Sequence, residues 1–204
     1  MDKCFCFFFQ KEALPCFLWV GLNAVGISPL WKAARGGRSE RMSMPQLSLH
    51  TPLGPLTLSE EDGALVALDW GWGRDQTETP LLCRGRDQLH AYFDGALREF
   101  DLPLAPAGSL YRQRIWQALS SIPFGQTRSY GAIASIAGGS ARSVGGANGA
   151  NPIPIVIPCH RVIGTTGIGG YSGGDGLATK RFLLALEQGY SGGRSTQARL
   201  LEEE

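Results

Sequence analysis

The sequence predicts an α/β (α+β) fold in which a small antiparallel sheet domain precedes a mainly helical domain. Between Leu47 and Trp70, apolar and polar residues alternate around the turn sequences LGPL and EDG, as they do in short strands. After residue 109, apolar residues recur at helical spacing instead. The proline-rich stretch DLPLAPAG, residues 101–108, predicts a linker between the two parts.

The first helix is expected over residues 81–95, LLCRGRDQLHAYFDG, with Gly95 as its stop. Cys83 and His90 lie on it, and packing is a better explanation for both than a role as metal ligands. Ser109 is a good N-cap for a second helix over 109–120. Four apolar residues are predicted to share one side of that helix: Leu110, Ile115, Trp116 and Leu119.

Two short helical segments, 129–137 and 140–150, are separated by Gly138 and Gly139. A helix, a short glycine turn and a second helix have the shape of a DNA-binding helix-turn-helix, although many helix pairs share this pattern. A last helix, LATKRFLLALEQ, places Glu187 near its end, beside an apolar face.

Composition indicates a globular protein, with 204 residues, 43% hydrophobic and 18% charged. The five cysteines are odd in number, which argues against a paired disulfide framework and favours a reducing cytoplasm.

Residues 44–108 carry four Arg against ten Asp and Glu, a net charge of −6, whereas residues 109–188 carry seven basic against two acidic residues, a net charge of +5. This asymmetry suggests that one half faces a polyanion, although two solvated surfaces of opposite sign would also explain it.

The two ends of the chain differ from its middle. Residues 1–43 are interpreted as an extension outside the fold, and residues 189–204 as a flexible tail. Residues 13–31 are uncharged and long enough to span a bilayer, but prolines interrupt them and no secretory cleavage site follows. A membrane anchor therefore stays as the alternative. The Cys4-x-Cys6 pair has no second pair of ligands nearby and does not predict a metal site.

The second helix of the predicted pair has an unusual composition. Nearly all its side chains are small, and Arg142 is its one long side chain. Reading bases in the major groove takes several long polar side chains, so a slim helix fits the minor groove better. Tight helix–helix packing explains the glycines equally well. If the helix does bind DNA, Arg142 could fill the space left when a base is extruded from the stack.

Cys159 sits in the motif PCHRVIG behind the apolar run NPIPIVI, and four roles are open to it. A disulfide or a metal site is the weaker option, because no other cysteine lies in this half. An inert buried thiol is a serious alternative. Against it stand the polar residues Asn151, His160 and Arg161, and a frame of prolines that would hold Cys159 in one fixed orientation.

A cysteine nucleophile needs help to lose its proton at neutral pH. On an extended segment adjacent side chains point in opposite directions, so His160 should reach Cys159 only through a water. The histidine would then need a carboxylate on its far nitrogen. Asp175 and Glu187 are the two acidic residues in this half, and Glu187, on a buried helix face, is the better choice.

The motifs SYGAIA, ARSVGGANGANPIPIVIPCHRVIG, GYSGG and LLALE, in this order, resemble the O6-alkylguanine-DNA alkyltransferases, the methylated-DNA–protein-cysteine methyltransferases. The resemblance covers about residues 44–188. It implies a ribonuclease-H-like N-terminal domain over 44–105, with little direct role in chemistry. It also implies a winged-helix-like DNA-binding and active-site domain over 109–188.

The resemblance also implies a role for each site residue. Cys159 would accept the alkyl group, with His160 and Glu187 as the activating relay and Asn151 as a brace of the active-site segment. Tyr130 would contact the flipped nucleotide, and Arg142 would be the intercalating finger. The extruded base would be held by the carbonyls of Cys159 and Val162 and by the loop of Tyr171 and Ser172.

The expected partner is double-stranded DNA that contains O6-alkylguanine, with O4-alkylthymine left open as a second substrate. No cofactor, metal or membrane is expected, and the protein should act as a monomer. Transfer of an alkyl group to the thiol gives a thioether, which has no good leaving group, so each molecule should react once. Two other functions remain: a sensor that binds alkylated DNA without chemistry, and a cysteine hydrolase.

Overall fold

The computed structural model of the chain describes residues 44–191. The predicted extension over residues 1–43, its membrane-anchor alternative and the Cys4-x-Cys6 pair lie outside the described residues, as does the tail from residue 192 on. Within the described part, none of the helices has the length and apolar character of a membrane span.

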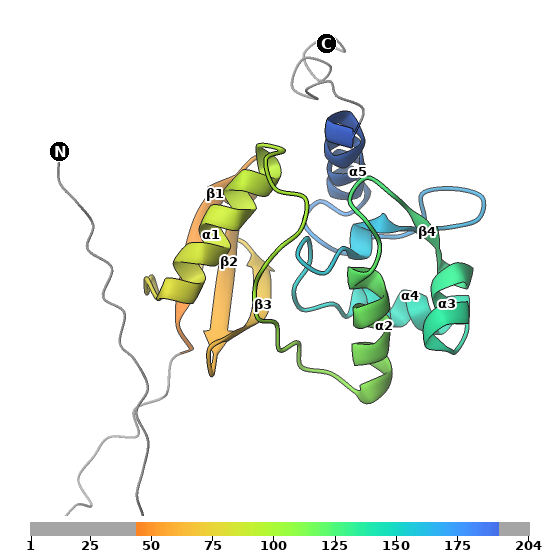
Figure 1. Cartoon of the computed structure of the whole chain (residues 1–204), viewed down its shortest axis with the longest axis horizontal. Coiled ribbons are helices and arrows are strands. Elements are labelled where there is room, and N and C mark those ends of the chain that lie inside the picture. The colour runs from red at the N-terminus through yellow and green to blue at the C-terminus, as the bar shows by residue number, and fades with distance from the viewer. Residues whose placement is uncertain (1–43, 192–204) are drawn as a thin grey trace, which may run out of the picture. The chain divides into compact units, whose positions relative to one another are not determined.

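The first half is built on a three-stranded antiparallel sheet in the order β1-β2-β3 (Figure 1). Its strands are β1 (Gln46–Thr51), β2 (Gly54–Glu61) and β3 (Ala64–Trp70), as the alternating pattern predicts. Asp62 and Gly63 join β2 to β3 and both have positive φ, of 49° and 76°, which suits a tight two-residue hairpin turn. The buried leucines of the strands form part of the core: Leu47, Leu49, Leu56, Leu58, Leu65 and Leu68.

Helix α1 (Pro80–Phe93) packs on one face of this sheet (Figure 1). Its N-cap Thr79 accepts a hydrogen bond from the Leu82 amide, and Gly95, with φ of 73°, follows its end, so the predicted helix and its stop are confirmed. Cys83 is half-buried on this helix, whereas His90 is exposed and does not pack in the core as expected.

The predicted linker over residues 101–108 is pinned to the sheet. Leu104 forms a parallel bridge with Leu65, in which the Leu65 amide donates to Pro103 and the Ala105 amide donates to Leu65. Strand β3 lies at the sheet edge, so its free backbone groups can bond to this extended segment. The segment therefore acts as a short extra strand as well as a connection.

The second half begins with three helices: α2 (Leu110–Ser120), α3 (Tyr130–Ala137) and α4 (Ala141–Gly149). Ser109, Ser129 and Ser140 cap their N-termini through their hydroxyl groups. Helices α3 and α4 contact each other across Gly138 and Gly139, which both have positive φ. The predicted helix pair is therefore present.

Leu110 departs from the expected packing of α2. Ile115, Trp116 and Leu119 are buried, but Leu110 is 80% exposed. Leu110 and Leu119 are nine residues apart, about two and a half helical turns, so they lie on opposite faces of the helix.

The remaining elements surround Cys159. Strands β4 (Arg128–Ser129) and β5 (Val162–Ile163) form a short parallel pair, and Cys159–Arg161 form a single 3₁₀ turn, η1. Helix α5 (Leu177–Ser191) ends the described chain (Figure 1). It continues to Ser191, so the predicted tail boundary at residue 189 is too early. Residues from both halves share one hydrophobic core.

Candidate active site

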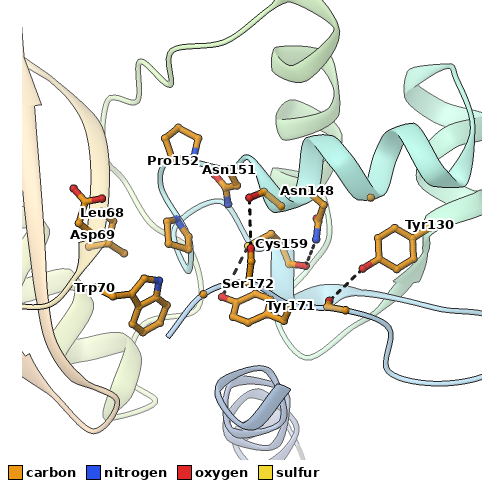
Figure 2. A pocket seen from close by; sticks show the side chains of 15 residues that line it. Leu68, Asp69, Trp70, Tyr130, Asn148, Asn151, Pro152, Cys159, Tyr171 and Ser172 are labelled. Atoms are coloured by element: carbon orange, nitrogen blue, oxygen red, sulfur yellow. Dashed lines mark hydrogen bonds between the residues drawn. The ribbon is translucent and has the colours of Figure 1, made fainter. Parts of the chain in front are cut away.

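A cavity of about 580 Å³ opens beside Cys159. Strand β3, helices α3 and α4, the loop after α4 and the loop before α5 all contribute to its wall. Figure 2 shows Cys159 between Tyr130 on one side and Trp70 on the other. The side chains labelled there are Leu68, Asp69, Trp70, Tyr130, Asn148, Asn151, Pro152, Cys159, Tyr171 and Ser172.

Cys159 is a free thiol, only 4% exposed, at the start of η1. Its Sγ lies 4.0 Å from the hydroxyl oxygen of Tyr171. Burial raises the pKa of the Cys159 thiol, and neighbouring groups, Asn151 and Tyr171 first among them, offset this only in part. The resting residue is thus a thiol, and it needs a base to react as a nucleophile.

The proline-rich segment before Cys159 is a rigid, strained turn. Ile155 is fully buried and has a φ of 71°, a conformation that costs a β-branched residue on the order of 1–3 kcal/mol. The Asn151 amide spans this turn: its Nδ2 donates to the Ile157 carbonyl at 2.8 Å, and its Oδ1 accepts from the Ile153 amide at 3.1 Å. These bonds fix the backbone that leads into Cys159.

His160 and Glu187 form a buried pair beneath the cavity. The Nε2 atom of His160 lies 2.7 Å from Oε1 of Glu187, and both side chains are completely buried. Arg161 lies against the same carboxylate, with Nε 2.9 Å from Oε2. Burial by itself would raise the pKa of Glu187, but hydrogen bonds and charges from His160 and Arg161 outweigh it and lower the pKa to about 2. Glu187 is therefore ionised at neutral pH.

His160 is held neutral, with its free nitrogen available. Burial first, and then the positive charges of Arg161 and Lys180, lower the pKa of His160 in spite of the opposing effect of Glu187. Because the ionised Glu187 can only accept, Nε2 carries the hydrogen and Nδ1 carries the lone pair. Nδ1 is buried and has no hydrogen-bond partner among the described residues, so no direct bond joins it to Cys159. The segment is a 3₁₀ turn and not extended as expected, yet the two side chains are separated as predicted.

Three further predicted residues line the same cavity. The hydroxyl of Tyr130 donates to the Gly170 carbonyl at 3.3 Å, and that of Ser172 donates to the Gly149 carbonyl at 3.4 Å. Burial, and then the proximity of Cys159, raises the pKa of both Tyr130 and Tyr171. Both phenols therefore remain protonated and can donate hydrogen bonds.

Arg142 and Val162 lie away from the cavity wall. Arg142 is exposed in the first turn of α4. Val162 is fully buried, and its carbonyl accepts a hydrogen bond of 2.6 Å from Nζ of Lys180. The Cys159 carbonyl likewise accepts from Asn148, at 3.2 Å. Both carbonyls that the resemblance assigns to the base thus already have protein donors.

The surroundings of the glycines in α4 distinguish tight helix–helix packing from a surface that is kept slim for an outside partner such as DNA. A Cβ atom on Gly146 would meet nothing within 4 Å, and one on Gly145 or Gly149 would come no closer than 3.8 Å to another described residue. Packing within the described part of the chain therefore does not require these glycines. They leave a slim surface beside the cavity, open to an outside partner.

Sequence reasoning missed four residues of the site. Asn148 and Lys180 are buried donors to backbone carbonyls, Tyr92 donates to Glu187, and Trp70 lines the cavity. Asn148 had a usable signal, since it follows the buried Val144 by four residues on the same face of α4. Within residues 44–191, no group of three His, Cys, Asp or Glu side chains is placed to hold a metal.

A helix pair with a slim, glycine-rich second helix, next to a cavity with a buried thiol at its wall, is the arrangement expected of a DNA-binding protein with a cysteine-centred site. Two family models of 6-O-methylguanine DNA methyltransferase match the chain. The ribonuclease-like domain matches residues 47–106, and the DNA binding domain matches residues 110–189.

Curated relatives match across nearly their whole length. A methylated-DNA–protein-cysteine methyltransferase of Mycolicibacterium paratuberculosis is 48% identical over 158 residues, which cover 71% of this chain and 92% of the relative. The constitutive enzyme of that name from Bacillus subtilis is 41% identical over 152 residues, 68% of this chain and 92% of the relative. The crystal structure of Mycobacterium tuberculosis OGT in complex with DNA superimposes with a TM-score of 0.66 at 41% identity, covering 77% of this chain and 99% of that one. The chain therefore belongs to the 6-O-methylguanine DNA methyltransferase family.

Proposed function

We propose that this chain repairs DNA by direct reversal: it transfers the alkyl group from O6 of guanine in double-stranded DNA to its own Cys159, once per molecule. The observation that carries the proposal is the buried Cys159 thiol in a cavity next to the slim helix α4, with the His160–Glu187 pair beneath it. The relay and the cavity are complete within one chain, which supports action as a monomer.

The transfer needs a thiolate, and the relay can generate one. His160 Nδ1 receives the thiol proton through a bridging water, because it is the unprotonated nitrogen of a neutral ring. The Cys159 sulfur then attacks the alkyl carbon, an S–C bond forms and the C–O6 bond breaks. The electron pair of the broken bond stays on guanine, which takes up a proton from the Tyr130 hydroxyl. Tyr130 then regains a proton from water, and His160 releases to water the proton that it took from the thiol. The product is unmodified guanine and a thioether.

The placement of the cavity supports a flipped base. Gly145, Asn148 and Gly149 of α4 form part of its wall, so a base extruded from DNA bound along α4 would enter beside Cys159. Tyr171 and Ser172 would hold the base from the opposite loop, and Asn151 would keep the segment of Cys159 in place. Arg142, exposed on α4, would fill the space that the base leaves in the duplex.

The mass of the intact protein after incubation with duplex DNA containing O6-methylguanine tests this proposal. The native chain should gain the mass of one methyl group and stop at one equivalent. Cys159→Ser should gain none, while Cys83→Ser, which changes the half-buried thiol of α1, should react as the native chain does. Methylation of the Cys159→Ser variant would refute the assignment. DNA binding without any mass gain in the native chain would indicate a sensor, and repeated turnover of an ester would indicate a hydrolase.

A further inference from the structure

The Glu187 carboxylate is surrounded by four donor residues from three parts of the chain: α1, the loop after α2 and η1. Its Oε2 accepts from the Gly125 amide at 3.0 Å and from Arg161 Nε at 2.9 Å. Its Oε1 accepts from His160 Nε2 at 2.7 Å, from Arg161 Nη2 at 3.0 Å and from the Tyr92 hydroxyl at 2.7 Å. Tyr92 therefore donates to the same oxygen that His160 uses.

Tyr92 comes from the opposite half of the chain, 95 residues before Glu187. It lies in the last turn of α1 and is completely buried. Its ring is enclosed by Phe93, Phe100 and Phe124, with ring centroids 5.4 to 6.0 Å away. This packing fixes the direction of the hydroxyl, and because Tyr92 is completely buried, the hydroxyl has no contact with solvent.

The hydroxyl remains a donor over the whole working range of pH. Burial, and then the charge of Glu187, raises the pKa of Tyr92 well above its ordinary value. A donor that never ionises and cannot move lowers the basicity of the oxygen it binds. Here that oxygen is Oε1, whose basicity decides how strongly Glu187 favours the protonated form of His160.

We propose that Tyr92 is a positioning residue of the relay, which saturates Oε1 of Glu187 so that His160 stays neutral until Cys159 gives up its proton. The inference rests on the proposed function, since it assigns Tyr92 a task in that reaction. Tyr92 thereby gives the N-terminal half a part in the chemistry, whereas the family resemblance implies that this half has little direct role in it.

The other charged and titratable groups around His160 act in known directions. Arg161, next to it in η1, and Lys180, on α5, both lower the pKa of His160 by their positive charge. Glu187, on the same helix as Lys180, raises it. Substitution of Tyr92 leaves these three in place, so a change in the His160 titration reports the lost hydroxyl.

Tyr190 offers a matched control. It also joins α5 to the end of α1: its hydroxyl donates to the Phe93 carbonyl at 3.3 Å, and its ring lies against Gly95. The Tyr190 hydroxyl thus bonds to the backbone of α1, whereas the Tyr92 hydroxyl bonds to the Glu187 carboxylate. Tyr92→Phe and Tyr190→Phe thus each remove one hydroxyl between the same two helices, and only the first removes a donor to the relay.

The experiment follows the rate of benzyl transfer from O6-benzylguanine to Cys159 in the full chain across pH, for the native protein and both variants. In Tyr92→Phe, Oε1 becomes more basic and His160 protonates more easily, so the acid limb of the pH–rate profile should move to higher pH. The rate should fall several-fold on that limb and recover at alkaline pH, with unchanged affinity for the free base. Tyr190→Phe should keep the native profile.

Titration of the His160 ring by NMR gives a readout that does not depend on activity. The pKa of His160 should rise in Tyr92→Phe and stay at the native value in Tyr190→Phe. In a Glu187→Gln background, removal of the Tyr92 hydroxyl should have little further effect on the profile, because the residue acts through Glu187.

Three results would overturn the inference. These are a native pH profile in Tyr92→Phe, an equal loss of rate at every pH, and an equal effect of both Tyr→Phe variants. Failure of the proposed function looks different, because the native chain itself would then not take up the benzyl group at Cys159.

Discussion

At the scale of single residues, the buried charge of Glu187 needs an explanation. It is an ionised carboxylate with no exposed surface, and such a charge is tolerated only when donors surround it. The Arg161 guanidinium meets it in a fork and also donates to the Ile122 carbonyl, so the two charges are buried as a unit. This unit stabilises the fold and also holds the His160 ring, which contacts the same carboxylate.

Glu187→Gln should therefore destabilise the protein by about 3 kcal/mol at neutral pH, because Arg161 loses the charge that compensates its own burial. The folded pKa of Glu187, about 2, lies below its ordinary value of 4.5. The stabilisation from its charge is thus fully present above pH 4.5 and is lost as the pH falls towards 2. Urea denaturation at several pH values should show the native and variant proteins converging in that window.

Glu78→Gln is the control for the Glu187 substitution. Glu78 pairs with Arg86 on the surface, and its side chain is 67% exposed. An exposed pair of this kind contributes little to stability, so the variant should match the native protein at every pH. A Glu187→Gln protein that stays as stable as the native chain at neutral pH would contradict the account of the buried pair.

The residues with a local signal could be predicted from the sequence, and those that depend on distant partners could not. Cys159 and His160 stand out in their proline frame, and Glu187 is one of only two acidic residues in the basic half. Tyr92 fits the apolar stripe of its helix, so the stripe predicts its burial but gives no sign of its hydroxyl bond. The contact with Glu187 arises only when the two halves pack together.

At the scale of elements, the helix caps and tight turns are the best-predicted features because neighbouring residues decide them. Ser109 at the start of α2 is such a feature. The 3₁₀ turn at Cys159 and the bridge between Leu104 and Leu65 depend on tertiary contacts instead. The prolines around these segments indicate irregular backbone without saying which form it takes.

Helix α4 is the element that should separate base extrusion from chemistry. Arg142→Ala removes its exposed long side chain, while the relay and the cavity wall stay intact. Repair of O6-methylguanine in duplex DNA should slow about tenfold or more, the effect of about 1.4 kcal/mol on a barrier, because nothing would then fill the vacated stack. Reaction with free O6-benzylguanine, which needs no flipping, should keep its native rate. Single-turnover rates on the two substrates make the comparison.

Arg84→Ala provides a control for the lost charge, since Arg84 is exposed on α1 in the acidic half. It should leave both rates unchanged. If low salt restored the duplex rate of Arg142→Ala, the role of Arg142 would be that of a phosphate contact only. A matched fall in the duplex and free-base rates of a well-folded variant would show that Arg142 is not the finger.

At the scale of the whole molecule, the two halves meet at the site in two places. Tyr92 of α1 donates to the Glu187 carboxylate, and the end of β3 forms part of the cavity wall. Trp70, at that end, packs on the loop before α5 so tightly that a Cβ on Gly173 or Gly174 would come within 3.0 and 3.1 Å of its ring. Both the acidic and the basic half of the chain therefore set the size of the cavity.

This arrangement predicts that Trp70 affects large alkyl groups more than small ones. Cys159 lies between Tyr130, on the side of α3, and Trp70 (Figure 2), so a flat O6 substituent that extends past the sulfur would meet the indole ring. Loss of roughly 50 Å² of apolar contact corresponds to about 1.3 kcal/mol, close to tenfold in rate. Trp70→Ala should slow transfer from O6-benzylguanine by about that factor and change methyl transfer from duplex DNA less than about twofold, because a methyl group does not reach the ring.

Trp72→Ala is the control for this substitution. It removes an exposed tryptophan two residues away that does not line the cavity, and it should leave both rates at their native values. If methyl and benzyl transfer slow equally in Trp70→Ala, the indole supports only the loop of Tyr171 and Ser172, and the second half alone sets the range of alkyl groups.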